Sequence, residues 1–145
     1  NPETISLANF NPSIFSVNQQ GTGQGAILIS SSGEIAAPAG SIPGAASRAV
    51  SRGDFISIYC MGLGQVLNQP ASGAAASGGS TTNTQPTVAI GGIPVTPSFS
   101  GLAPGFVGLY QVNVQVPTAA PTGNSVPVVL TIGGETSNSV TIAVQ

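Results

Sequence analysis

Histidine, lysine and tryptophan are absent from this chain of 145 residues, and charged side chains of either sign make up only 4% of it. A soluble domain usually has a surface that is about 25–35% charged. Here the ionic side chains are Glu3, Glu34, Arg48, Arg52, Asp54 and Glu135. The remaining polar surface must consist of Ser, Thr, Asn, Gln and backbone. Such a surface repels neighbouring molecules weakly and hydrogen-bonds to them readily, so these absences favour self-association.

The missing side chains also exclude most catalytic chemistry. Without histidine or lysine there is no ordinary general base, no Schiff-base amine and no lysine–asparagine crosslink, and a serine nucleophile lacks an imidazole. The four acids are scattered, and the sequence contains neither an acidic calcium loop nor a Cys/His metal set. A glycosidase would need two of these acids to meet in space. We therefore expect a protein that is not an enzyme, with no catalytic residue, cofactor or metal.

Charge and hydropathy also limit the partners of the chain. A formal net charge of −2 offers no basic cluster for nucleic acid or anionic membranes. No apolar run reaches the roughly 18 residues that a membrane span needs. The start at Asn1 suggests a removed leader or a fragment, although no signal peptide is visible. With so few titrating groups, stability should vary little between about pH 3 and pH 10.

Alternation of apolar and polar residues predicts an all-β sandwich. The expected strands cover residues 4–7, 13–17, 26–30, 55–61, 87–90, 93–99, 109–116, 126–132 and 139–144. Gly91-Gly92 and Gly133-Gly134 should form hairpin turns, and residues 36–47 should be loop. Residues 68–86 are rich in Ser, Gly and Ala and predict a flexible loop. Cys60, the single cysteine, should be buried in a strand interior, where it acts as a small hydrophobe.

Residues 102–117 (LAPGFVGLYQVNVQVP) and 53–59 (GDFISIY), followed by Gly62-Leu63-Gly64, carry a resemblance to a known family. They resemble the uncharacterised C-terminal immunoglobulin-like domain found repeatedly in secreted proteins of Solibacter and other acidobacteria. Residues 11–15, 23–26 and 136–142 also fit, whereas Cys60 and Met61 depart from the small or hydroxyl-bearing residues expected there. The resemblance implies an immunoglobulin-like β-sandwich in an extracellular or cell-surface setting. It implies no catalytic or ligand-binding residues.

Short motifs give weaker signals. Arg52-Gly53-Asp54 is a tripeptide that integrins read at loop tips, but it immediately precedes a strand, so a local ion pair or turn cap is the simpler interpretation. Asn11-Pro12-Ser13 is not a glycan acceptor because of its proline. The 72–84 loop either carries O-linked sugar or is undecorated.

Surface glycans are a second class of partner. Sugar-binding modules usually stack sugars on exposed aromatic rings, and this chain offers Tyr59 and Tyr110 but no tryptophan. Gln111, Asn113 and Gln115 alternate along one strand and form an amide row. This row either binds a glycan, is solvated, or faces another subunit.

The N-terminal segment lies outside the main sandwich pattern. We divide the chain into residues 1–20, an N-terminal arm with the first strands, and residues 21–145, a single immunoglobulin-like β-sandwich. The arm can add as a strand to a neighbouring copy, with Ile5, Leu7 and Phe10 filling pockets there. The sequence thus predicts a secreted, non-enzymatic subunit that assembles with copies of itself into an extracellular filament or surface assembly. The alternative is an adhesive or carbohydrate-binding module of a larger secreted protein.

Overall fold

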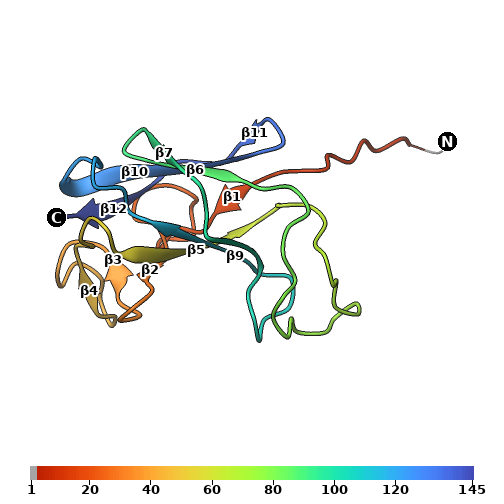
Figure 1. Cartoon of the computed structure of the whole chain (residues 1–145), viewed down its shortest axis with the longest axis horizontal. Coiled ribbons are helices and arrows are strands. Elements are labelled where there is room, and N and C mark those ends of the chain that lie inside the picture. The colour runs from red at the N-terminus through yellow and green to blue at the C-terminus, as the bar shows by residue number, and fades with distance from the viewer. Residues whose placement is uncertain (1–2) are drawn as a thin grey trace.

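The computed structural model describes residues 3–145 and contains only β-strands, turns and loops (Figure 1). The strands form two sheets that pack face to face. The predicted all-β class is therefore confirmed. Within the described chain, no helix has the length and apolar character needed to cross a membrane.

The larger sheet has seven strands centred on β5. Its strands are β1 (Ser13–Ile14), β2 (Ile27–Ile29), β3 (Ile35–Ala36), β4 (Ser47–Arg48), β5 (Phe55–Met61), β8 (Phe99–Leu102) and β9 (Tyr110–Gln115). Their order is β4-β3-β2-β5-β9-β8, and β1 also pairs with β5. Because Cys60 is opposite Ile14 on one side and Tyr110 on the other, β1 lies on the side of β5 away from β9.

The smaller sheet has five strands centred on the long strand β10. Its strands are β6 (Thr87–Ile90), β7 (Ile93–Val95), β10 (Gly123–Ile132), β11 (Glu135–Thr136) and β12 (Val140–Val144). The order β11-β10-β6-β7 is completed by β12, which pairs with β10. Val128 is opposite both Ile90 and Val140, so β12 lies on the side of β10 away from β6.

The core fills the space between the two sheets and follows the alternation in the sequence. In β5 the side chains of Ile56, Ile58 and Cys60 are fully buried. They belong to one cluster with Val128 and Leu130 of the smaller sheet. The predicted burial of Cys60 is confirmed, and this burial raises the pKa of its thiol to about 12.

Two predicted hairpin strands end differently from the expectation. The strand predicted for 93–99 stops at Val95, and the chain then crosses to the larger sheet as β8. Pro94 lies in β7 and Pro97 lies in the crossing itself, and proline cannot donate a backbone hydrogen bond to a sheet. Gly133-Gly134 does form a turn, but it leads first to the short β11 and only later to β12.

Residues 68–86, predicted as a flexible loop without strands, are hydrogen-bonded to the larger sheet at residues 80–82. The N–H of Thr82 donates to the carbonyl of Ser100 (2.9 Å), and the N–H of Leu102 donates to the carbonyl of Ser80 (2.8 Å). Ser80 and Thr82 are buried, and their hydroxyls are hydrogen-bonded inside the protein. Residues 80–82 thus lie along β8 and cover its edge, and neither hydroxyl is available for an O-linked sugar.

Candidate functional site

The N-terminal arm, residues 3–9, extends away from one end of the sandwich (Figure 1). Within the described chain these residues make no hydrogen bond and form no strand, although the sequence predicts a strand over 4–7. The alternating residues 4–7 are therefore not hydrogen-bonded to any backbone among residues 3–145. Ile5 and Leu7 are 79% and 91% exposed, which is unusual for large apolar side chains.

The arm is anchored at its root by Phe10 and Asn11. The N–H of Asn11 donates to the carbonyl of Gly62 (2.9 Å). The ring of Phe10 packs against the core and lies directly over Gly64 and Gly133, where a Cβ atom would meet it. Of the three proposed donor residues, the structure thus places Ile5 and Leu7 on the free arm and Phe10 against its own sandwich.

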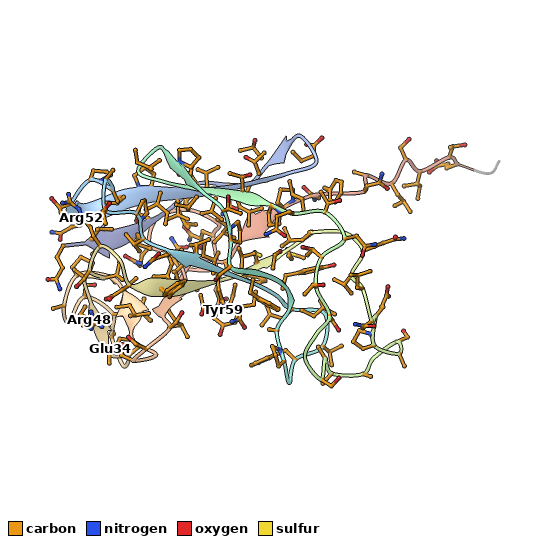
Figure 2. The ribbon with its side chains drawn as sticks, in the orientation of Figure 1. Glu34, Arg48, Arg52 and Tyr59 are labelled. Atoms are coloured by element: carbon orange, nitrogen blue, oxygen red, sulfur yellow. The ribbon has the colours of Figure 1, made fainter. Side chains whose placement is uncertain are left out.

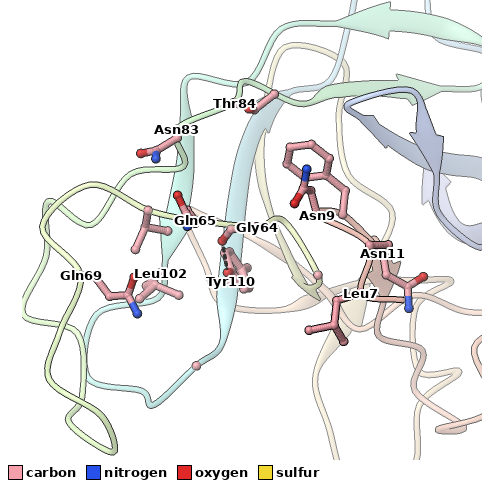
Figure 3. A pocket seen from close by; sticks show the side chains of 15 residues that line it. Leu7, Asn9, Asn11, Gly64, Gln65, Gln69, Asn83, Thr84, Leu102 and Tyr110 are labelled. Carbon is pink, nitrogen blue, oxygen red and sulfur yellow. Dashed lines mark hydrogen bonds between the residues drawn. The ribbon is translucent and has the colours of Figure 1, made fainter. Parts of the chain in front are cut away.

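A groove of about 820 Å³ opens beside the arm root. Figure 3 shows Leu7, Asn9 and Asn11 on one side of it, Gln65, Gln69 and Leu102 on the other, and Tyr110 between them. The hydroxyl of Tyr110 donates a hydrogen bond to the carbonyl of Gly64. Burial, with a smaller effect of Cys60, raises the pKa of Tyr110, so the hydroxyl stays protonated and remains a donor. None of the described residues that line the groove has a charged side chain.

The residues on the far side of this groove were not predicted from the sequence. Residues 65–67 pair with 81–83 through bonds from Leu67 N–H to the Thr81 carbonyl (2.8 Å) and from Asn83 N–H to the Gln65 carbonyl (2.9 Å). The available signal was local: Val66 and the pair Thr81-Thr82 are β-branched residues in a segment otherwise rich in Gly, Ser and Ala.

A second surface is the outer face of the seven-stranded sheet. Phe55 and Phe15 are 44% and 41% exposed, and Tyr59, half-buried, points outward from β5 (Figure 2). Tyr59 is opposite Gln111 in the register, and Phe55 is opposite Gln115. The predicted amide row is thus placed beside aromatic side chains, and the Nε2 of Gln111 donates to Oδ1 of Asn113 (2.9 Å).

Half of the ionic side chains gather at the β3–β4 edge, far from the arm (Figure 2). The Nε of Arg48 lies 2.8 Å from a Glu34 carboxylate oxygen, and its Nη1 lies 3.9 Å from Asp54. A hydrogen bond from Ser32, and then Arg48, lower the pKa of Glu34, which is the opposite of what a glycosidase general acid needs.

The Arg52-Gly53-Asp54 tripeptide forms a turn in which the arginine side chain is not paired with the aspartate. Asp54 N–H donates to the Ser51 carbonyl (3.1 Å), and the Ser51 N–H donates to the Asp54 carboxylate (3.4 Å). Arg52 donates from Nε to the carbonyl of Ala120 (2.8 Å). The turn interpretation is therefore confirmed, whereas the acid is paired by Arg48 and not by Arg52.

Residues 3–145 contain no group of three or more His, Cys, Asp or Glu side chains arranged to hold a metal ion. Comparison of the chain with protein-family models, with curated proteins and with solved structures finds no match. The function of the chain must therefore follow from the chemistry and geometry of the arm, the groove and the aromatic–amide face.

Proposed function

We propose that this chain is a non-enzymatic structural subunit that is secreted and assembles with copies of itself, through its N-terminal arm, into an extracellular filament or surface assembly. The observation that carries the proposal is the exposure of Ile5 and Leu7 on an arm that makes no hydrogen bond within the described chain. A segment with alternating apolar residues and unpaired backbone is suited to strand addition on another sheet.

The scarcity of charge supports the same proposal. With three of its six ionic side chains gathered in one cluster, the protein has little charge left to keep copies apart. The resemblance to secreted acidobacterial domains supports an immunoglobulin-like topology and an extracellular or cell-surface location, both of which are part of this proposal. The absence of histidine and lysine supports a structural role over a catalytic one.

The energetics require an acceptor strand and not merely an apolar patch. Burying Ile5 and Leu7 contributes about 3–6 kcal/mol in total. Ordering the backbone of residues 3–7 costs about 1–2 kcal/mol per residue, which offsets that contribution. Each backbone hydrogen bond adds about 0.5–1.5 kcal/mol, so the arm binds firmly only where a partner supplies unpaired N–H and C=O groups.

Removing the arm should therefore abolish assembly. Deletion of residues 1–8 keeps the anchors Phe10 and Asn11, so we expect a folded monomer by sedimentation velocity and no polymers by electron microscopy. The full-length double variant Ile5→Ser/Leu7→Ser should behave in the same way. Thr4→Ala/Ser6→Ala, which alters the intervening polar side chains, is the matched control and should still polymerise. Polymers formed without the arm, or a native chain that stays monomeric at high concentration, would refute the proposal.

The aromatic–amide face favours a second candidate function, an adhesive or carbohydrate-binding module. Exposed aromatic rings beside amide side chains offer both stacking and hydrogen bonds to a sugar. If this face binds polysaccharide, Tyr59→Ala and Gln111→Ala should each weaken retention on insoluble polysaccharides. Thr87→Ala on the other sheet should leave retention unchanged. Retention that is unaffected by both substitutions on the aromatic–amide face would eliminate this candidate.

A further inference from the structure

Within residues 3–145, the sheet edges at β4, β7 and β12 are protected against the addition of a strand. The β4 edge carries the charged Arg48, and the exposed edge strand β7 contains Pro94, which has no N–H to donate. The β12 edge is covered by residues 23–25 and 50–52, which form backbone hydrogen bonds with it. Beside β12, β11 is only two residues long and carries Glu135. Charge, proline and coverage are the usual devices that prevent pairing between copies.

The edge at β8 is covered as well, but the segment that covers it last has none of these devices. Residues 80–82 cover β8, and residues 65–67 cover 81–83 in turn. The outermost segment is therefore 65–67, and it contains neither a charged residue nor a proline. The backbone groups of Gln65 and Leu67 that bond to 81–83 point inward to the sheet. Strand alternation turns the N–H and C=O of Val66 the opposite way, and no backbone–backbone bond within residues 3–145 uses them. Val66 lines the groove.

The hydrogen bond between Asn11 and Gly62 indicates which segment fits this edge. β1 runs antiparallel to β5, and the Asn11–Gly62 bond extends this contact beyond β5 with a shift of one residue from the Ser13–Met61 register, at the left-handed Gly62. Two residues further along each segment, Asn9 comes opposite Gly64, and after two more, Leu7 comes opposite Val66. In its own chain the arm lies against Gly64 only as far as Asn9, whereas Leu7 lines the groove but is exposed, and the arm beyond it extends away from the body (Figure 1).

We propose that the groove and the Val66 backbone are the acceptor for the arm of a second copy of this chain. In this pairing Leu7 of one copy lies opposite Val66 of the next, and Ile5 lies on the same side of the arm as Leu7. The uncharged groove beside Leu102 and Tyr110 receives these apolar side chains. This inference rests on the proposed function, since it names the surface that receives the arm.

Crosslinking between two single-cysteine variants tests the pairing. In a Cys60→Ala background, a Leu7→Cys chain is mixed with a Val66→Cys chain, so that a disulfide between the two positions can only join different molecules. Facing residues of paired strands are close enough for a disulfide. Thiols held together in this way have an effective concentration of about 1 mM, so at about 10 µM protein we expect roughly a hundredfold more heterodimer than for unpaired chains. The control mixes Leu7→Cys with Ser41→Cys, an exposed residue remote from the groove.

A second pair of variants tests the edge without cysteine chemistry. Val66→Lys places a charge on the proposed acceptor, and Thr96→Lys places the same charge just beyond Pro94 at the β7 edge. We expect loss of polymers for Val66→Lys and native polymer length for Thr96→Lys.

The outcomes separate this inference from the proposed function. One outcome is that native polymers depend on residues 1–8 but the mixed Leu7→Cys and Val66→Cys chains form no heterodimer. In that case the acceptor is elsewhere and the proposed function stands. If a Leu7→Cys/Val66→Cys double variant forms a disulfide within a monomer, the arm folds back on its own chain and the inference is wrong. If the native chain forms no polymer, the proposed function itself fails.

Discussion

Gly62→Ala is expected to lower the free energy of unfolding by about 2–5 kcal/mol. Gly62 has a φ of 79°, a left-handed conformation that costs an alanine about 1–2 kcal/mol. An added Cβ would also overlap the carbonyl oxygen of Asn11, which is backbone and cannot rotate away. Overpacking of this kind typically costs a further 1–3 kcal/mol or so. Urea unfolding followed by circular dichroism measures the loss.

Gly134→Ala is the matched control for this substitution. Gly134 has a similar φ of 84°, but nothing lies within 4 Å of its added Cβ. Its replacement should therefore cost only the conformational part, about 1–2 kcal/mol. Equal losses for the two variants would contradict the expected overlap at Asn11.

The contact between Asn11 and Gly62 connects the stability of the fold to the assembly of copies. Asn11 N–H donates to the Gly62 carbonyl, and this bond sets the register in which an arm segment would match Val66. Displacing Asn11 should loosen the arm root as well as destabilise the sandwich. Hydrogen exchange at the Asn11 amide should therefore accelerate in Gly62→Ala beyond what the loss of global stability explains, and remain slow in Gly134→Ala.

Where alternation is long and regular, the sequence was sufficient to locate the strands. The predicted 55–61 strand coincides with β5, because Ile56, Ile58 and Cys60 alternate with outward-facing residues over seven positions. The chain also indicated the Gly-Gly turns, whose glycines adopt positive φ. Strand 93–99 was mispredicted because local alternation does not record the transfer of a chain from one sheet to the other, which depends on partners distant in sequence.

The candidate site was only partly predictable for the same reason. The exposed arm could be inferred from Ile5 and Leu7 because their alternation continues outside the main pattern. The groove could not be inferred in this way. It is formed by segments near residues 10, 65, 83, 102 and 110, which come together only through the pairing of strands distant in sequence. The β-branched side chain of Val66 is a local signal for a strand, but only the unprotected edge of its segment identifies it as an acceptor.

Raising the pH from about 8 to about 11 is expected to lower the free energy of unfolding by about 2–3 kcal/mol through Cys60 alone. Burial raises the pKa of this thiol from 9.0 in the unfolded chain to about 12 in the fold. Between these two values the unfolded chain releases a proton that the folded chain retains, so alkaline pH favours unfolding. The stability is complete below the unfolded pKa and is lost as the pH rises toward the folded pKa. The composition predicts a stability that varies little between about pH 3 and pH 10. The titration of Cys60 therefore shortens this range at its alkaline end.

At acid pH, stability is lost as the pH falls, and the loss is smaller than the loss at alkaline pH. The pKa of Glu34 is lowered in the fold, so its contribution is present above its unfolded pKa and is lost as the pH falls through the folded pKa. Glu34 lies on the surface, where screening by solvent keeps such a contribution small. The main pH dependence of this fold should therefore lie at alkaline pH.

Cys60→Ala separates the thiol from the other groups that titrate at alkaline pH. The substitution leaves a small cavity and should lower stability at every pH, so the shape of the curve is the informative quantity. Tyr110, whose pKa burial also raises, contributes in the same direction above about pH 10 and is present in both proteins. Urea midpoints measured from about pH 7 to about pH 11 should therefore fall steeply for the native chain and much less for the variant. Parallel curves would show that the thiol ionises as easily in the fold as in the unfolded chain, and that the packing around β5 admits water.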